Sequence, residues 1–188
     1  EKVGVTKLYD YLRAFGLGQE SGLNFPGESQ GILDDPSTWS ASQRYTIPYG
    51  QGISVNALQT ASVYSTIANG GVRVTPSLVK GYVQADGSVK PATAPTQTRV
   101  VSQSTATQVE SMLEAVTTDE GTAPAARIDG YRVAGKTGTA QRVDSSCGCY
   151  RGYTASFVGF APADDPKLVV LVVLDNPING HYGGTVAA

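Results

Sequence analysis

The chain has 188 residues, 40% of them hydrophobic and 16% charged, and a formal net charge of −2 at pH 7. The length suits one domain or one lobe with a real core, and the composition excludes a disordered chain. The charge gives no basic surface for nucleic acid, and the longest apolar run, residues 168–174, is too short to span a bilayer. Because the chain starts without Met and stops without a closing element, we expect it to be part of a longer protein.

The first predicted element is a helix that ends near Gly16. Val5, Leu8 and Leu12 recur at helical spacing, and a glycine is typical of the left-handed residue that follows a helix. Residues 18–49 come next. They are rich in Gly, Pro, Ser and Asp and show little periodicity, which predicts a long irregular excursion over the surface.

A second predicted helix stops at the glycines of residues 69–71. One face carries its apolar residues, which are Leu58, Ala61, Tyr64, Ile67 and Ala68. Residues 72–83 then alternate and contain Pro76, which indicates an edge strand or extended segment. Asp86 and Gly87 are typical of a hairpin turn, and the Pro- and Thr-rich residues 91–98 are predicted to form a loop.

A third predicted helix has Ser104 as its N-cap. Its inward face is expected to carry Val109, Met112, Leu113 and Val116. Three β runs follow, at residues 131–140, 154–161 and 168–175, and the short turn between the last two predicts an antiparallel hairpin. This order of elements favours an α+β fold, with an antiparallel sheet packed with helices.

Two cysteines stand together as Cys147-Gly-Cys149. With the single histidine of the chain they cannot supply the four ligands of a structural zinc site, so no metal is expected. A bridge between positions two apart is short, and the sequence leaves open whether the thiols are free or joined.

The stretch GYRVAGKTGTA, residues 130–140, fits two chemistries. Its glycines with Lys136 and Thr137 satisfy the phosphate-loop pattern G-x-x-x-x-G-K-[ST], and residues 136–138 also form the K-T-G triplet of penicillin-recognising serine enzymes. A phosphate loop must follow a buried strand and open a helix. Residues 121–129 do not read as a buried strand, and the glycine-containing stretch after Thr137 has no helical face. We therefore do not expect a nucleotide.

On an extended strand the same residues form a site for an anionic peptide-like ligand. Thr137 and Thr139 project to one side and offer two hydroxyls, while Gly138 lets a substrate backbone lie against the strand. Lys136 places a positive charge beside them. The amide of Thr139 is a candidate donor to a developing oxyanion.

With its surroundings, this strand resembles the transpeptidase domain of class B penicillin-binding proteins, the division-type D,D-transpeptidases. The resemblance runs in the family's order through residues 8–16, 22–28, 49–54, 67–72, 133–140, 157–162 and 181–184. It implies a β-lactamase/transpeptidase-like fold, incomplete at both ends. Residues 1–188 are then expected to be the C-terminal portion of that domain.

The family works with three motifs, Ser-x-x-Lys, Ser-x-Asn and Lys-Thr/Ser-Gly. Residues 77–80 and 54–56 match the first two as strings. Ser77 lies in a strand-like segment, where residues three apart point to opposite faces, and residues 54–56 are better interpreted as the N-cap region of the following helix. The family's order places the true motifs upstream of this chain. We therefore expect the nucleophile to be missing and the fragment alone to be inactive.

By the family's pattern, Thr137 and Thr139 bind the carboxylate of a peptide or β-lactam, and Lys136 tunes proton transfer. His181 and Tyr182 match the family's aromatic pair near the pocket wall, with histidine as a polar departure. The glycines of residues 49–52 are expected to shape the backbone rather than to react.

The resemblance implies a full-length serine-type transpeptidase that crosslinks peptidoglycan stem peptides ending in D-Ala-D-Ala, is acylated by β-lactams and needs no cofactor. Expected partners are the N-terminal remainder of the same protein and proteins of cell division or elongation. The expected location is the outer face of the bacterial cytoplasmic membrane, with an N-terminal anchor outside this chain. Two alternatives stay open: a related serine hydrolase (a carboxypeptidase or β-lactam sensor) and a non-catalytic module of the same fold.

Overall fold

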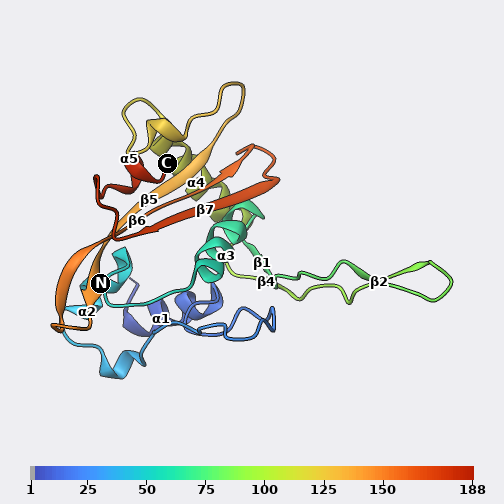
Figure 1. Cartoon of the computed structure of the whole chain (residues 1–188), viewed down its shortest axis with the longest axis horizontal. Helices are drawn as coiled ribbons and strands as arrows, with labels where there is room; N and C mark the ends of the chain where they lie inside the picture. Colours follow the sequence, from blue (N-terminus) through green and yellow to red (C-terminus); the bar gives the residue numbers. More distant parts are fainter. Residues whose placement is uncertain (1–2) are drawn as a thin grey trace.

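A three-stranded antiparallel sheet with helices on both faces organises the computed structural model, which describes residues 3–188 (Figure 1). The strands are β5 (Ala134–Asp144), β6 (Cys149–Ala161) and β7 (Leu168–Asp175), in the order β5-β6-β7. Both pairings are antiparallel, so the predicted β6–β7 hairpin and the α+β class are confirmed. Two strands differ from the predicted runs, because β5 begins at Ala134 rather than at residue 131 and β6 begins at Cys149 rather than at residue 154.

The register assigns each residue of the sheet to a face. Lys136 pairs with Val158 and therefore shares a face with the buried Phe160, whereas Thr137 pairs with Phe157 on the opposite face. The first face is covered by α3 (Ala57–Ala68) and α4 (Gln103–Glu114), which contribute Ile67 and Leu113 to a buried cluster with Ala134, Phe160 and Ala163. The second face is covered near its middle by η4 (Pro124–Ala126) and α5 (Gly183–Val186), around a cluster of Ala123, Phe157 and Ala187.

The first helix is α1 (Val5–Ala14), and Gly16 follows it with a φ of 100°, as predicted. The irregular excursion after it contains only single turns, which are η1 (Pro36–Thr38), α2 (Gln43–Thr46) and η2 (Ile47–Tyr49). Trp39 is only 4% exposed and packs edge-on against Tyr9 of α1. Its indole N–H donates to the carbonyl of Asp34 at 2.9 Å, so a buried aromatic anchors the excursion.

Buried polar contacts hold the same excursion to the start of α3. Asn56 is the N-cap of this helix and forms a capping box with Gln59. Gln59 is 1% exposed, and its amide nitrogen also donates to the carbonyls of Gln19 and Gln30 at 2.8 and 2.9 Å. Residues 54–56 are therefore the N-cap region, as predicted, and Ser54 forms a backbone bridge with Ile32.

Glu28, in its ionised form, stabilises the contact between the excursion and the start of α3. It accepts hydrogen bonds from the backbone amide and the hydroxyl of Ser21, both at 2.9 Å, and from the side-chain amide of Asn56 at 3.2 Å. The backbone hydrogen bond from Ser21 is the largest influence that lowers the pKa of Glu28, and the two side-chain donors act in the same direction. The ionised form is therefore the one that the fold stabilises.

Replacing Glu28 with glutamine is expected to lower the melting temperature of the full-length protein at neutral pH and to flatten its acid dependence. Because the folded pKa lies below the ordinary value, the stabilisation is present above the unfolded pKa and is lost as pH falls through the folded one. Wild type and Glu28→Gln should converge once the pH has fallen below the folded pKa of Glu28. Thermal melts between pH 3 and 7 measure this, with the exposed Glu120→Gln as control. A constant difference at every pH would contradict the assignment.

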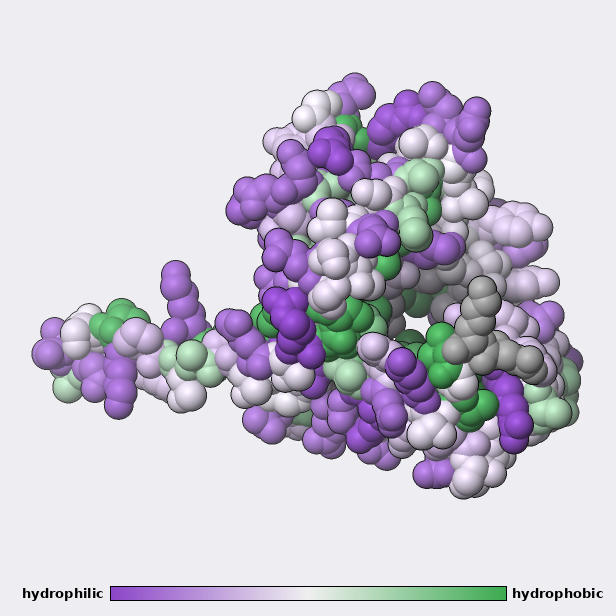
Figure 2. Space-filling view, turned by 180° about the vertical axis from the view of Figure 1, so that it is seen from behind, coloured by the Kyte–Doolittle hydropathy of each residue, from purple (hydrophilic) through white to green (hydrophobic). Residues whose placement is uncertain are grey.

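Two small antiparallel ladders follow α3. β1 (Val72–Val74) pairs with β4 (Gln97–Arg99), and β2 (Gly81–Val83) pairs with β3 (Val89–Pro91) around the predicted turn at residues 86–87. The second ladder stands clear of the body (Figures 1 and 2). The segment of residues 72–83, predicted as an edge strand or extended segment, thus contains two short strands, and it is interrupted near Pro76, which cannot donate to a ladder. Both ends of the predicted loop at residues 91–98 are strand.

The helix α4 corrects two predictions. Its N-cap is Ser102 and not Ser104, because the hydroxyl of Ser102 accepts from the backbone amide of Thr105 at 3.1 Å. Met112 is 67% exposed, whereas Leu113 is buried and Val109 packs against the core. Met112 lies at the margin of the helical stripe that faces the sheet and so remains in solvent.

Between residues 3 and 188, no helix is long and apolar enough to cross a membrane.

Candidate functional site

The K-T-G triplet lies within β5, with four strand residues before Gly138 and six after it. No helix starts at Thr137, because the chain stays in strand conformation to Asp144, with one irregularity in the pairing between Gln141 and Val143. A phosphate loop needs a helix N-terminus at this point, so the motif does not have the local structure of a phosphate loop. Among the described residues, β5 pairs only with β6. Its other edge can therefore accept an extended ligand.

The two threonines of the motif share one face, as alternation predicted. The hydroxyl of Thr137 lies 3.2 Å from that of Thr122. The hydroxyl of Thr139 accepts a hydrogen bond from the backbone amide of Gly183 at 3.1 Å. Both hydroxyls keep further hydrogen-bonding capacity in this arrangement, since a hydroxyl can donate once and accept twice.

Lys136 reaches the same place from the neighbouring position. Its ammonium donates to the carbonyl of Thr137 at 3.0 Å and lies 3.4 Å from the hydroxyl of that residue. Its side chain is exposed, and it forms no ion pair within residues 3–188. The site therefore presents an uncompensated positive charge beside two hydroxyls, which favours an anionic group.

Two glycines bring the segment of residues 181–184 against the sheet. A Cβ on Gly183 would meet the carbonyls of Gly138 and Ser156, and a Cβ on Gly184 would meet the carbonyl of Thr122. Only residues without side chains fit here, so α5 begins directly over the motif. This close approach places His181 and Tyr182 beside Thr139.

The histidine ring contacts two tyrosine rings. Its ring centroid lies 4.2 Å from that of Tyr153, with 16° between the planes, and 4.3 Å from that of Tyr182, with 37°. Tyr153 is the member that the sequence interpretation missed. Its cross-strand partner is Gln141, two positions beyond Thr139 on the same face. No local signal in the sequence pairs Tyr153 with His181, and the predicted run of β6 began only at residue 154, after this tyrosine.

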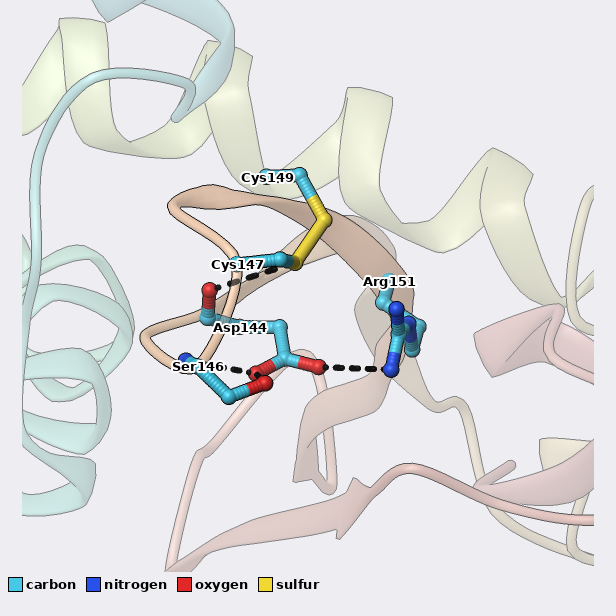
Figure 3. The surroundings of a disulfide bond; sticks show 5 residues. All are labelled: Asp144, Ser146, Cys147, Cys149 and Arg151. Carbon is cyan, nitrogen blue, oxygen red and sulfur yellow. Dashed lines mark hydrogen bonds and ion pairs between the residues drawn. A yellow bond between two sulfur atoms is a disulfide. The ribbon is translucent and has the colours of Figure 1, made fainter.

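The β5–β6 hairpin extends beyond the site as an arm and closes at the cysteines. Cys147 and Cys149 are joined by a disulfide, which decides the alternative that the sequence left open (Figure 3). The hydroxyl of Ser146 donates to Asp144 at 2.6 Å, and this bond is the main cause of the lowered pKa of that carboxyl. Tyr150 accepts a hydrogen bond from Gln51 at 3.3 Å, so the arm contacts the glycine-containing loop of residues 49–52.

Residues 77–80 and 54–56, which match the family's other two motifs only as strings, lie away from this site. Ser77 is exposed in the loop after β1, and its hydroxyl bonds only to the backbone of Val79. It therefore does not stand one helical turn from Lys80, as a Ser-x-x-Lys nucleophile would. The described residues bring together Lys136, Thr137, Thr139, His181 and Tyr182, and they place no Ser-x-x-Lys motif at this site.

Comparison with known proteins shows the family to which this fold belongs. A family model described as the penicillin-binding protein transpeptidase domain matches residues 1–188. The chain is 43% identical to penicillin-binding protein PbpB of Mycolicibacterium smegmatis, over all of this chain and 31% of the relative, and 40% identical to stage V sporulation protein D of Bacillus subtilis, over all of this chain and 29% of that protein.

Solved structures agree with the sequence relatives. Penicillin-binding protein 3 of Mycobacterium tuberculosis, crystallised with aztreonam, superposes with a TM-score of 0.91 at 44% identity, over 97% of this chain and 44% of that one. A peptidoglycan synthetase from Bifidobacterium adolescentis gives 0.87 at 32% identity, over 99% and 34%. The chain belongs to the transpeptidase-domain family of the class B penicillin-binding proteins, and it spans about a third of the length of these sequence relatives.

Proposed function

We propose that this chain is the substrate-recognition half of a peptidoglycan D,D-transpeptidase domain. The observation that carries the proposal is the edge strand β5, where the ammonium of Lys136 and two threonine hydroxyls lie beside a stacked aromatic group, an arrangement that suits an anionic ligand. Relatives named peptidoglycan D,D-transpeptidase, such as PenA of Neisseria gonorrhoeae at 33% identity, support it.

In the proposed reaction, a serine of an upstream Ser-x-x-Lys motif attacks the carbonyl of the penultimate D-Ala. The peptide bond to the terminal D-Ala breaks, and the leaving amine takes the proton that the serine has lost. An amine of a second stem peptide then attacks the ester and releases the serine as the crosslink forms. In a β-lactam the broken amide lies in a ring, so the leaving group stays attached to the acyl-enzyme.

In these reaction steps, the residues of this chain bind and orient the substrate. Thr137 and Thr139 hold the terminal carboxylate by hydrogen bonds, and Lys136 adds charge and assists proton transfer. Gly138 leaves room for the ligand backbone, and the amide of Thr139 is the proposed oxyanion donor. The side chains of His181 and Tyr182 line the neighbouring wall.

The proposal extends to the whole protein. The missing nucleophile lies in an upstream part of the same protein, and an N-terminal membrane anchor holds the enzyme at the outer face of the cytoplasmic membrane. Division or elongation proteins are the proposed partners. The membrane proposal is supported by relatives whose names refer to peptidoglycan, such as PenA and the peptidoglycan synthetase of Bifidobacterium adolescentis.

A fluorescent penicillin tests the function. It should label the full-length protein covalently, and labelling should be blocked by ampicillin and abolished when the serine of the upstream Ser-x-x-Lys is replaced with alanine. A peptide ending in D-Ala-D-Ala with an added amine acceptor should give the crosslinked product. Release of the free acid alone identifies a carboxypeptidase or hydrolase instead, and absence of labelling identifies a non-catalytic module.

A further inference from the structure

The stack of Tyr153, His181 and Tyr182 differs from a purely aromatic wall in what it exposes. The imidazole is stacked on the ring of Tyr153, with 4.2 Å between the centroids, and the ring of Tyr182 lies tilted against it at 4.3 Å. Because the protein's own rings already contact the imidazole in this way, its edge is the part that offers a polar contact to a ligand.

That edge carries two nitrogens without partners. His181 is partly buried, and neither ring nitrogen makes a hydrogen bond within residues 3–188. Within residues 3–188, the Nε of Arg73 is the single buried side-chain nitrogen or oxygen that lacks a hydrogen-bond partner. The imidazole nitrogens lack a partner and are not among the buried atoms, so they reach solvent. At least one of them carries a proton in every protonation state, and the edge therefore always offers a hydrogen-bond donor.

The position of this donor is set by the sheet. Gly183 bonds to Thr139, and the stack rests on Tyr153 at the level of Gln141, on the face that carries both threonines. A ligand held at Thr137 and Thr139 that continues along β5 past Thr139 must pass the imidazole edge.

We propose that His181 is a specificity-determining residue, whose ring edge selects acyl donors that carry a carboxylate or another hydrogen-bond acceptor on the acyl side chain. Tyr153 and Tyr182 are positioning residues, because they fix the ring so that the edge points away from the stack. This inference rests on the proposed function, since it assigns a ligand preference to the same site.

Two penicillins that differ in one group test the inference. Carbenicillin is benzylpenicillin with a carboxylate in place of one hydrogen on the side-chain α-carbon. In the full-length protein, His181→Phe keeps a flat ring against the tyrosines and removes the donor. The second-order acylation constant for carbenicillin, divided by that for benzylpenicillin, should fall about tenfold, the size of a charge-assisted hydrogen bond partly open to water.

A second variant separates the donor from the stack. His181→Gln keeps an N–H donor without a ring, and it should retain part of the carbenicillin preference that His181→Phe loses. Equal changes for both penicillins, or no change for either, would overturn the specificity role and leave the proposed function intact. Failure of the wild-type protein to react with benzylpenicillin would instead overturn the proposed function, and the inference with it.

Discussion

Replacing Lys136 with alanine in the full-length protein is expected to slow acylation by a fluorescent penicillin by about a hundredfold. The ammonium lies 3.0 Å from the carbonyl of Thr137 and 3.4 Å from its hydroxyl, and within residues 3–188 no carboxylate neutralises it. Its removal takes away the charge that attracts the ligand carboxylate and the group that assists proton transfer. Because the side chain is exposed, the fold should not change.

A second lysine of the chain provides the control. Lys167 is exposed in the turn before β7 and pairs with Asp165 at 2.8 Å, and surface pairs of this kind contribute little to stability. Lys167→Ala should leave both labelling and the melting temperature unchanged. If Lys136→Ala also labels at the wild-type rate, the K-T-G strand does not take part in acylation.

Much of the fold could be predicted, because its buried elements leave a periodic pattern. The apolar stripe of α3 and the buried run around Phe157 and Phe160 come from contact with two apolar clusters, one on each face of the sheet. The site strand was predicted from its residue types, because glycines and threonines at residues 135–140 fit an extended chain and not the start of a helix.

The β5–β6 arm could not be predicted in the same way. Residues 141–153 are mostly exposed, so no alternation of apolar and polar residues marks their pairing. The arm depends instead on cross-strand hydrogen bonds, the Cys147–Cys149 disulfide and the ion pair between Asp144 and Arg151 at 3.3 Å. These contacts form only when the turn is closed, and residue types alone do not reveal the turn.

The contacts of the aromatic stack could not be predicted from the sequence either. Tyr153 and His181 are distant in the chain and meet only because two glycines allow α5 to lie on the sheet. Sequence reasoning placed His181 and Tyr182 beside the pocket through the family resemblance, and it had no means of pairing them with a particular residue of β6. Contacts between remote segments follow from the register, which local patterns do not specify.

The largest effect on stability is expected from Gln59→Leu. The side chain is 1% exposed and bonds to the backbone amide of Asn56 and to the carbonyls of Gln19 and Gln30. Leucine has a similar size and leaves these three groups unpaired, at about 1–3 kcal/mol each. With some compensation from apolar burial, the unfolding free energy should fall by about 4 kcal/mol, which corresponds to a drop of about 10 °C in melting temperature.

The temperature at which the full-length protein loses penicillin labelling measures this change in the domain concerned. Gln108→Leu is the matched control, because Gln108 lies exposed on α4, and its replacement should change stability by no more than about 0.5 kcal/mol. Equal melting temperatures for the two variants would show that the excursion of residues 18–49 is not held by Gln59. A drop confined to Gln59→Leu would show that this single amide joins the excursion to the helix that supports the site strand.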